Sequence, residues 1–133
     1  MLFDPFSEIK IHEDAKIYVQ IDLIYGKERF PVIGLLDTGA TGTMLPRWVA
    51  EDLGIKYNAG KERFVNGISG RLKGMAHRIE TVLINDSGDE VGRNAIDITF
   101  VDGSDLALVG MNLITKFDWE LLFSEKIIKV GSI

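Results

Sequence analysis

The chain has 133 residues, of which 46% are hydrophobic and 26% are charged, and its formal net charge at pH 7 is −5. This balance is typical of a folded domain and argues against a disordered chain. The negative charge disfavours nucleic acid as a partner, because affinity for nucleic acid rests mainly on Lys and Arg that neutralise phosphates. The sequence contains no cysteine, which excludes disulfides and thiolate metal sites.

A single domain over residues 1–133 is the simplest organisation for a chain of this length. We expect residues 1–15 to begin as an irregular N-terminal segment, in which Ile9 and Ile11 hint at a short strand. The first residues carry acids and a proline, whereas a signal peptide would be basic and then apolar. No run approaches the roughly 18 apolar residues of a membrane span. We therefore expect a soluble, cytoplasmic protein with no membrane partner.

Alternation of apolar and polar residues predicts strands along most of the chain. In chain order, we expect strands over 16–24, 30–36, 78–84, 95–101, 106–109, 119–123 and 127–130. Short helices are predicted over 46–53, with Trp48 on the buried side, and over 111–117. Many short strands with two brief helices predict an all-β domain.

Residues 34–46 carry the most specific signal in the chain. Leu35 and Leu36 lead Asp37 directly into a tight turn. This apolar approach predicts that Asp37 stands at the end of a buried strand, where a carboxylate is destabilising unless hydrogen bonds or protonation compensate. Such groups concentrate at sites of chemistry, so we predict that Asp37 is catalytic. The competing interpretation is a turn residue whose side chain bonds to its own backbone.

Glycines at positions 60, 67, 70 and 74 surround a second notable region. Because glycine accepts positive φ without a steric clash, this spacing predicts a hairpin with a glycine-rich tip over 67–70. On its own, the pattern fits an ordinary exposed hairpin equally well. His12 and His77 have no partners at metal-binding spacing, so we expect no metal site.

Three motifs, in this order along the chain, resemble those of the retropepsin-like aspartic proteases, the single-domain relatives of retroviral protease. Residues 35–41, Leu-Leu-Asp-Thr-Gly-Ala-Thr, resemble the family's apolar-apolar-Asp-Thr-Gly-Ala turn. Residues 65–71, Val-Asn-Gly-Ile-Ser-Gly-Arg, resemble its glycine-rich flap tip with a central isoleucine. Residues 108–115, Leu-Val-Gly-Met-Asn-Leu-Ile-Thr, are similar to the segment before the family's C-terminal helix.

The resemblance implies an all-β fold of closed-barrel type with one or two short helices. It also implies an aspartic endopeptidase that activates water between two carboxylates, without a metal or organic cofactor. Like charges a few ångströms apart cannot both ionise cheaply, so one acid of the pair keeps its proton. The charged acid then acts as general base on the water, while the protonated one hydrogen-bonds the scissile carbonyl.

Roles for single residues follow from the same resemblance. It makes Asp37 the catalytic residue, with the active-site turn supported by Thr38, Gly39 and Ala40. Contact with substrate is assigned to Leu35 and to the flap residues Asn66, Gly67, Ile68, Ser69 and Gly70. Structural support is assigned to Gly110 and Asn112.

One chain supplies only one such acid. The sequence Asp-Ser-Gly at 86–88 is a known variant of the motif, but it lies in a polar stretch with no apolar strand beyond it, as in a hairpin turn. Its spacing from Asp37 leaves no room for a second lobe. The second acid is therefore expected to be Asp37 of another copy, in a C2 homodimer with an isologous interface. The expected partners are that second copy and a peptide or protein substrate.

The chain also departs from the retroviral pattern. Thr41 and Gly42 stand where retroviral enzymes carry two acids, and Met111 stands where they carry arginine. In the retroviral enzymes these positions can form an acid–arginine pair, and here both partners are replaced. The two replacements fit together, because losing only one partner would leave the other charge poorly paired. These departures leave open a non-catalytic dimerisation or peptide-binding domain. A domain released from a longer precursor, with a processing site in residues 1–15, is a further alternative.

Overall fold

The computed structural model describes residues 7–67 and 70–133, and most of their regular structure is β-strand. The strands are β1 (Ser7–Lys10), β2 (Tyr18–Tyr25), β3 (Glu28–Leu36), β4 (Thr43–Pro46), β5 (Lys61–Gly67), β6 (Gly70–Ile84), β7 (Glu90–Val101), β8 (Leu108–Val109), β9 (Phe117–Leu122) and β10 (Ile127–Ser132). The helices are α1 (Arg47–Asp52), the 3-10 helix η1 (Tyr57–Ala59) and α2 (Met111–Ile114). No helix in the described ranges has the length and apolar character of a membrane span. The predicted all-β class is confirmed.

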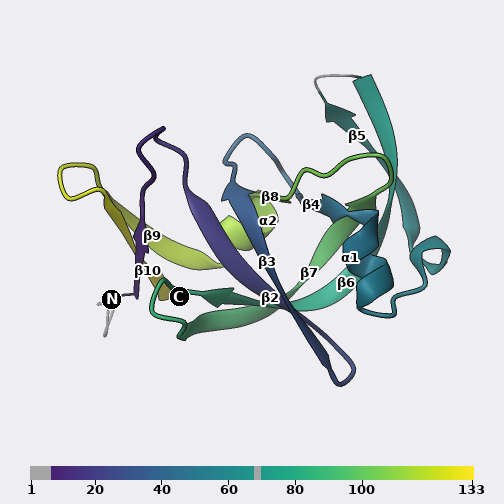
Figure 1. Ribbon diagram of the computed structural model, residues 1–133, viewed down its shortest axis with the longest axis horizontal. Coiled ribbons are helices and arrows are strands. Elements are labelled where there is room, and N and C mark those ends of the chain that lie inside the picture. Colours follow the sequence, from purple (N-terminus) through teal and green to yellow (C-terminus); the bar gives the residue numbers. More distant parts are fainter. Residues whose placement is uncertain (1–6, 68–69) are drawn as a thin grey trace.

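A seven-stranded sheet in the order β2-β3-β8-β4-β7-β6-β5 forms most of the fold. Strand β2 also pairs with the far end of β6, from Gln20 opposite Ile84 to Ile24 opposite Glu80, so the sheet closes on itself. Strand β5 stays outside this closed part and pairs only with the first half of β6. The β5–β6 hairpin therefore projects from the rest of the molecule (Figure 1). The expected closed barrel is confirmed.

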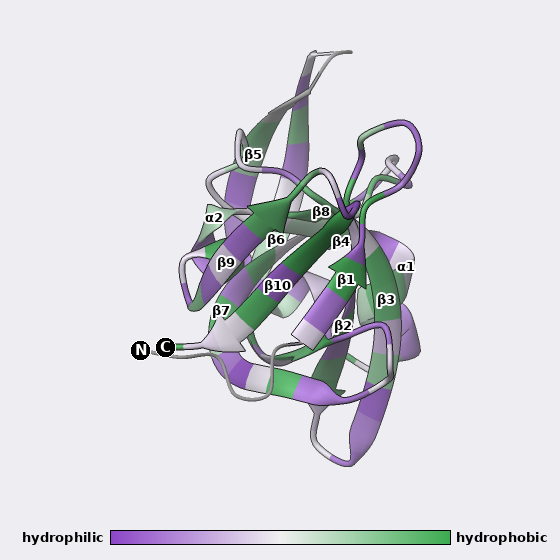
Figure 2. Ribbon diagram, turned by 90° about the vertical axis from the view of Figure 1, so that its left-hand side faces the viewer, coloured by the Kyte–Doolittle hydropathy of each residue, from purple (hydrophilic) through white to green (hydrophobic). Residues whose placement is uncertain are grey.

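A second sheet, in the order β1-β10-β9, packs against the barrel. Hydrophilic and hydrophobic residues alternate along β1 and β10 (Figure 2), as expected for strands with one buried face. Its inward side chains Ile9, Phe117 and Val130 belong to the same buried cluster as Ile21 and Phe100 of the barrel. The two sheets thus share one hydrophobic core.

Two predictions about buried residues are wrong. Trp48 is 50% exposed, and its ring meets Phe30 edge-on at 5.9 Å between centroids. A helix of six residues buries only one side, and in α1 that side belongs to Val49 and Ala50. The run 106–109 was also expected to be a fully buried strand, but Leu106 is exposed, because β8 begins only at Leu108.

Other element boundaries differ from the predicted ones. Strand β1 orders part of the segment 1–15 that was expected to be irregular at its start. Strand β4 was not predicted, because its four residues run into the proline that precedes α1. Helix α2 ends at Ile114, and the chain turns at once into β9.

The turn between β6 and β7 contains Asp86, as predicted. The Asp86 backbone N–H donates to the Glu8 carbonyl (3.2 Å), and Asp86 Oδ2 accepts the Lys10 N–H (2.7 Å). The Asn85 amide donates to Ser7 Oγ (3.2 Å). This turn therefore fastens β1 to the barrel.

We expect Asp86→Ala to loosen β1, because the Lys10 N–H loses its charged acceptor. The free energy of unfolding should fall by about 1 kcal/mol, and the Lys10 amide should exchange its hydrogen faster. Hydrogen exchange followed by NMR measures both effects. Asp89→Ala in the same turn is the control, and equal protection of Lys10 in both variants would contradict this role.

Candidate active site

Asp37 lies where β3 ends, in the turn that leads to β4. Strand β8 lies between these two strands, parallel to β3 and antiparallel to β4. The Asp37 N–H donates to the Val109 carbonyl (2.9 Å), and the Leu35 N–H donates to the Ala107 carbonyl (2.9 Å). The backbone of Asp37 is thus held by the sheet, although its side chain lies beyond the strand.

Hydrogen bonds within the turn between β3 and β4 orient the Asp37 carboxylate. Asp37 Oδ1 accepts the Gly39 N–H (2.8 Å), and the Asp37 carbonyl accepts the Ala40 N–H (3.2 Å). A Cβ atom on Gly39 would lie 3.2 Å from Asp37 Oδ1, which is tighter than ordinary contact. Asp37 is half-buried and Thr38 is exposed beside it. Within the described part of the chain, Asp37 Oδ2 accepts no hydrogen bond, so this oxygen is available to another group.

The segment after β8 packs directly beneath this turn. The Met111 N–H donates to the Ala40 carbonyl (2.8 Å), and the Asn112 N–H donates to the Thr41 carbonyl (3.1 Å). A Cβ atom on Gly110 would collide with the Gly42 carbonyl oxygen. Only glycine therefore lets the two segments approach this closely.

Thr43 joins the same two segments, although the sequence analysis did not single it out. It is 1% exposed, and its Oγ1 accepts the Gly110 N–H (3.2 Å) while donating to Asn112 Oδ1 (2.8 Å). The Asn112 amide in turn donates to the Asp97 carbonyl (2.8 Å) on β7. A lone threonine carries no sequence signal for this role, because its partners lie far along the chain.

The pairing register places further side chains on the same sheet face as Asp37. Leu35 lies two residues before Asp37, so their side chains share a face. Leu35 pairs with Leu108, and Leu108 pairs with Met44. All three are half-buried, whereas Leu45 on the opposite face is fully buried. Met44 and Leu108 were missed because an apolar residue in a short strand looks the same in sequence whether it faces the core or an open surface.

The residues assigned to the flap lie at the end of the β5–β6 hairpin. Asn66 pairs with Arg71, and Gly67 pairs with Gly70. Gly70 has φ of +114°, a backbone conformation that favours glycine. Ile68 and Ser69 lie outside the described residues.

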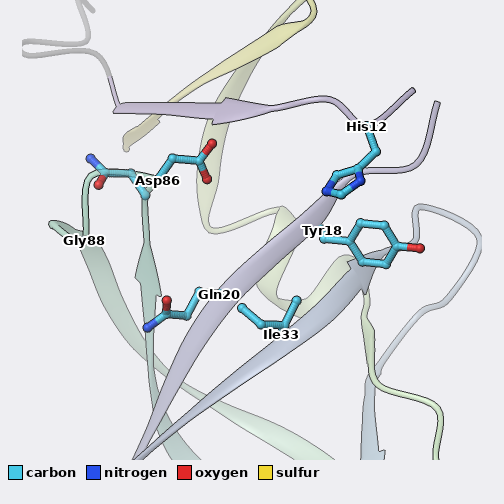
Figure 3. A pocket seen from close by; sticks show the side chains of 7 residues that line it. His12, Tyr18, Gln20, Ile33, Asp86 and Gly88 are labelled. Atoms are coloured by element: carbon cyan, nitrogen blue, oxygen red, sulfur yellow. The ribbon is translucent and has the colours of Figure 1, made fainter. Parts of the chain in front are cut away.

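Two surface hollows lie away from Asp37. The first, of about 320 Å³, is lined by His12, Tyr18, Gln20, Ile33, Asn85, Asp86 and Gly88 (Figure 3). In this hollow the His12 ring meets the Tyr18 ring edge-on at 4.9 Å, and Asp86 is engaged by the Lys10 N–H. The second, of about 400 Å³, is lined by residues of α1 and of the loop after β7. No group of three metal-ligating side chains occurs in the ranges 7–67 and 70–133.

Comparisons with known proteins agree with this geometry. A sequence model of the family described as aspartyl protease matches residues 21–113. The crystal structure of a retropepsin-like aspartic protease from Rickettsia conorii is similar to this chain with a TM-score of 0.69. The two are 20% identical, over 93% of this chain and 89% of the other. No curated protein sequence matches. The structural likeness establishes a retropepsin-like fold.

We expect Thr43→Val to weaken the support of the Asp37 turn. Valine matches threonine in shape, so the change removes two buried hydrogen bonds and leaves their partners unsatisfied. The free energy of unfolding should fall by about 2 kcal/mol, measured by urea denaturation. Thr115→Val is the control, because among the described residues the exposed Thr115 hydroxyl bonds only to the Met111 carbonyl (2.8 Å) one turn earlier. Equal losses in both variants would show that Thr43 has no special role.

Proposed function

The chain belongs to the aspartyl protease family, and we propose on that basis that it is an aspartic endopeptidase. The observation that carries the proposal is the position of Asp37, held at the backbone by β8 while one carboxylate oxygen is left without a partner among the described residues. An aspartic endopeptidase activates water between two carboxylates, so a second carboxylate must lie a few ångströms from that of Asp37. A second acid is therefore needed beside Asp37.

We assign it to Asp37 of a second copy, so that the active unit is a C2 homodimer. Asp86 is a poor candidate, because its carboxylate is engaged by the Lys10 N–H in a turn that fastens β1. Asp37 also lines neither of the two hollows described above. In the proposed dimer, the second copy would supply the other side of the substrate cleft.

In the proposed reaction, one Asp37 carboxylate takes a proton from water while the water oxygen bonds to the scissile carbonyl carbon. The protonated Asp37 of the other copy donates a hydrogen bond to the carbonyl oxygen. The tetrahedral intermediate then collapses and the C–N bond breaks. The Asp37 that took the proton from water gives it to the leaving nitrogen. No metal or organic cofactor takes part.

The remaining predicted residues support this step. In the proposed dimer, the exposed Thr38 would hydrogen-bond across the twofold axis. Gly39 and Ala40 keep the turn tight through their backbone hydrogen bonds to Asp37. Gly110 and Asn112 hold that turn from below. Together they fix both carboxylates before substrate arrives.

The substrate is proposed to be an extended peptide. Leu35, Leu108 and Met44 form a half-buried apolar surface beside Asp37, which favours hydrophobic side chains next to the cut. The β5–β6 hairpin would act as a flap over the peptide. The flap residues are Asn66, Gly67, Ile68, Ser69 and Gly70, of which Ile68 and Ser69 are assigned from the sequence motif alone.

A non-catalytic dimerisation or peptide-binding domain is the second candidate, motivated by Thr41 and Met111 in place of charged residues. The two candidates differ in their affinity for a transition-state mimic. We expect a statine-type inhibitor, which resembles the tetrahedral intermediate, to bind wild-type protein and to lose affinity at least about tenfold with Asp37→Asn. Isothermal calorimetry measures this. A dimer that neither binds the inhibitor nor cuts a peptide library supports the non-catalytic domain.

We expect Asp37→Asn to abolish cleavage of a peptide library, because the amide cannot act as a base. Mixing provides a sharper test of the dimer. If each site needs two Asp37 residues, adding an equal amount of the variant to wild-type chains should lower activity to about half after subunit exchange. Activity that stays unchanged on mixing would show that one chain is sufficient. Asp86→Asn protein added in the same amount is the control and should not inhibit.

A further inference from the structure

The β5–β6 hairpin continues the sheet face that carries Asp37. From Leu35, the register runs through Leu108 and Met44 to Thr99 of β7. It continues through Ala76 of β6 to Lys61 of β5. Because residues paired across a sheet point to the same side, Lys61 lies on the face of Leu35 and Asp37. Alternation along β5 places Arg63 and Val65 on that face as well.

The hairpin is basic although the chain is acidic. It carries Lys61, Arg63, Arg71 and Lys73 but only one acid, Glu62, whereas the whole chain has a net charge of −5. This positive charge is therefore concentrated on a hairpin that projects from the barrel (Figure 1).

The cations on the two faces of the hairpin differ in whether they have partners within it. On the face away from Asp37, the Arg71 guanidinium stacks over the Phe64 ring at 4.1 Å. On the same face, Lys73 pairs with Glu62 at 3.1 Å. These cations already have partners inside the hairpin.

Lys61 and Arg63 have no such partner among the described residues of the hairpin. Both are exposed, and within residues 7–67 and 70–133 neither forms an ion pair, a side-chain hydrogen bond or a ring contact. Farther along the same face, Arg78 is neutralised by Asp97 at 3.6 Å. Among the described cations of this face, Lys61 and Arg63 are thus the two available to a ligand.

We propose that Lys61 and Arg63 select substrates that carry Asp or Glu a few residues from the cleaved bond. The inference rests on the proposed function and adds a substrate class to it. Arg63 lies four residues before Gly67, a span of about 13 Å along a strand. If the hairpin end lies over the Asp37 pair, an acidic side chain about four residues from the cut would reach Arg63.

The physical basis is charge complementarity on a protein that otherwise repels anions. Charges across an interface contribute mainly to specificity and to the rate of association, and salt weakens them. Acidic peptides are the favoured occupant over nucleic acid, because two unpaired cations neutralise few phosphates. Selection should therefore appear in kcat/KM and decrease with ionic strength.

The test begins with a peptide library prepared by digesting a cell proteome with an unrelated protease. Mass spectrometry of the new ends identifies the cleavage sites of the wild-type protein. We expect Asp and Glu to be enriched on the flanks of these sites. One cleaved sequence is then synthesised as two peptides that differ only by Glu or Gln at the enriched position, and kcat/KM is measured for both.

The wild-type protein should prefer the Glu peptide by about tenfold at low salt, and the preference should shrink at high salt. The double variant Lys61→Gln/Arg63→Gln should lower it to below about twofold. The matched control, Arg71→Gln/Lys73→Gln, removes the same charge from the other face of the hairpin and should keep the preference. Thermal unfolding of both double variants checks that each is folded.

The outcomes separate this inference from the proposed function. Cleavage that depends on Asp37 but shows no acidic enrichment overturns the inference and leaves the proposed function standing. Equal loss of preference in both double variants also overturns it, because the overall charge would then matter and the face would not. If the wild-type protein cuts no peptide at all, the proposed function fails and the inference fails with it.

Discussion

The whole site depends on how β8 is inserted between β3 and β4. These two strands are joined by the Asp37 turn, yet they do not pair with each other, because β8 fills the space between them. The insertion gives the Asp37 backbone its partner in Val109 and places Gly110 against the Gly42 carbonyl. Segments that are distant in sequence thus become one rigid unit. A carboxylate can be held at a fixed position on such a unit without being enclosed by the chain.

The same insertion sets the direction of the elements around the site. Strand β4 leaves the turn beside β7, and β7 pairs along almost its whole length with β6. Strand β6 is long enough to close the barrel against β2 at one end and to carry β5 at the other. The projecting hairpin is therefore an extension of a barrel strand and not a separate loop. Its side chains inherit the register of the barrel, which is why one of its faces can be traced back to Leu35.

Much of this arrangement was accessible from the sequence, because local patterns specify local structure. The apolar approach to Asp37 predicted the end of a strand, and glycine spacing predicted the hairpin. The sequence could not tell which apolar residues face an open surface. Trp48, Met44 and Leu108 look like core residues, and only the register separates the two faces of a closed sheet. The part played by Thr43 was hidden for a related reason, since its hydroxyl has meaning only beside partners far along the chain.

The three-stranded sheet β1-β10-β9 is built entirely within one chain, and the turn holding Asp86 fastens its outer strand. In the proposed dimer, we expect each copy to keep this sheet within its own fold. On separation, each copy is then expected to stay folded, with only the shared site lost. Association would follow mass action, so the fraction of dimer, and with it the rate of hydrolysis, would rise with the concentration of the protein in the cell. Newly made chains would remain inactive monomers until their concentration was high enough for dimers to form.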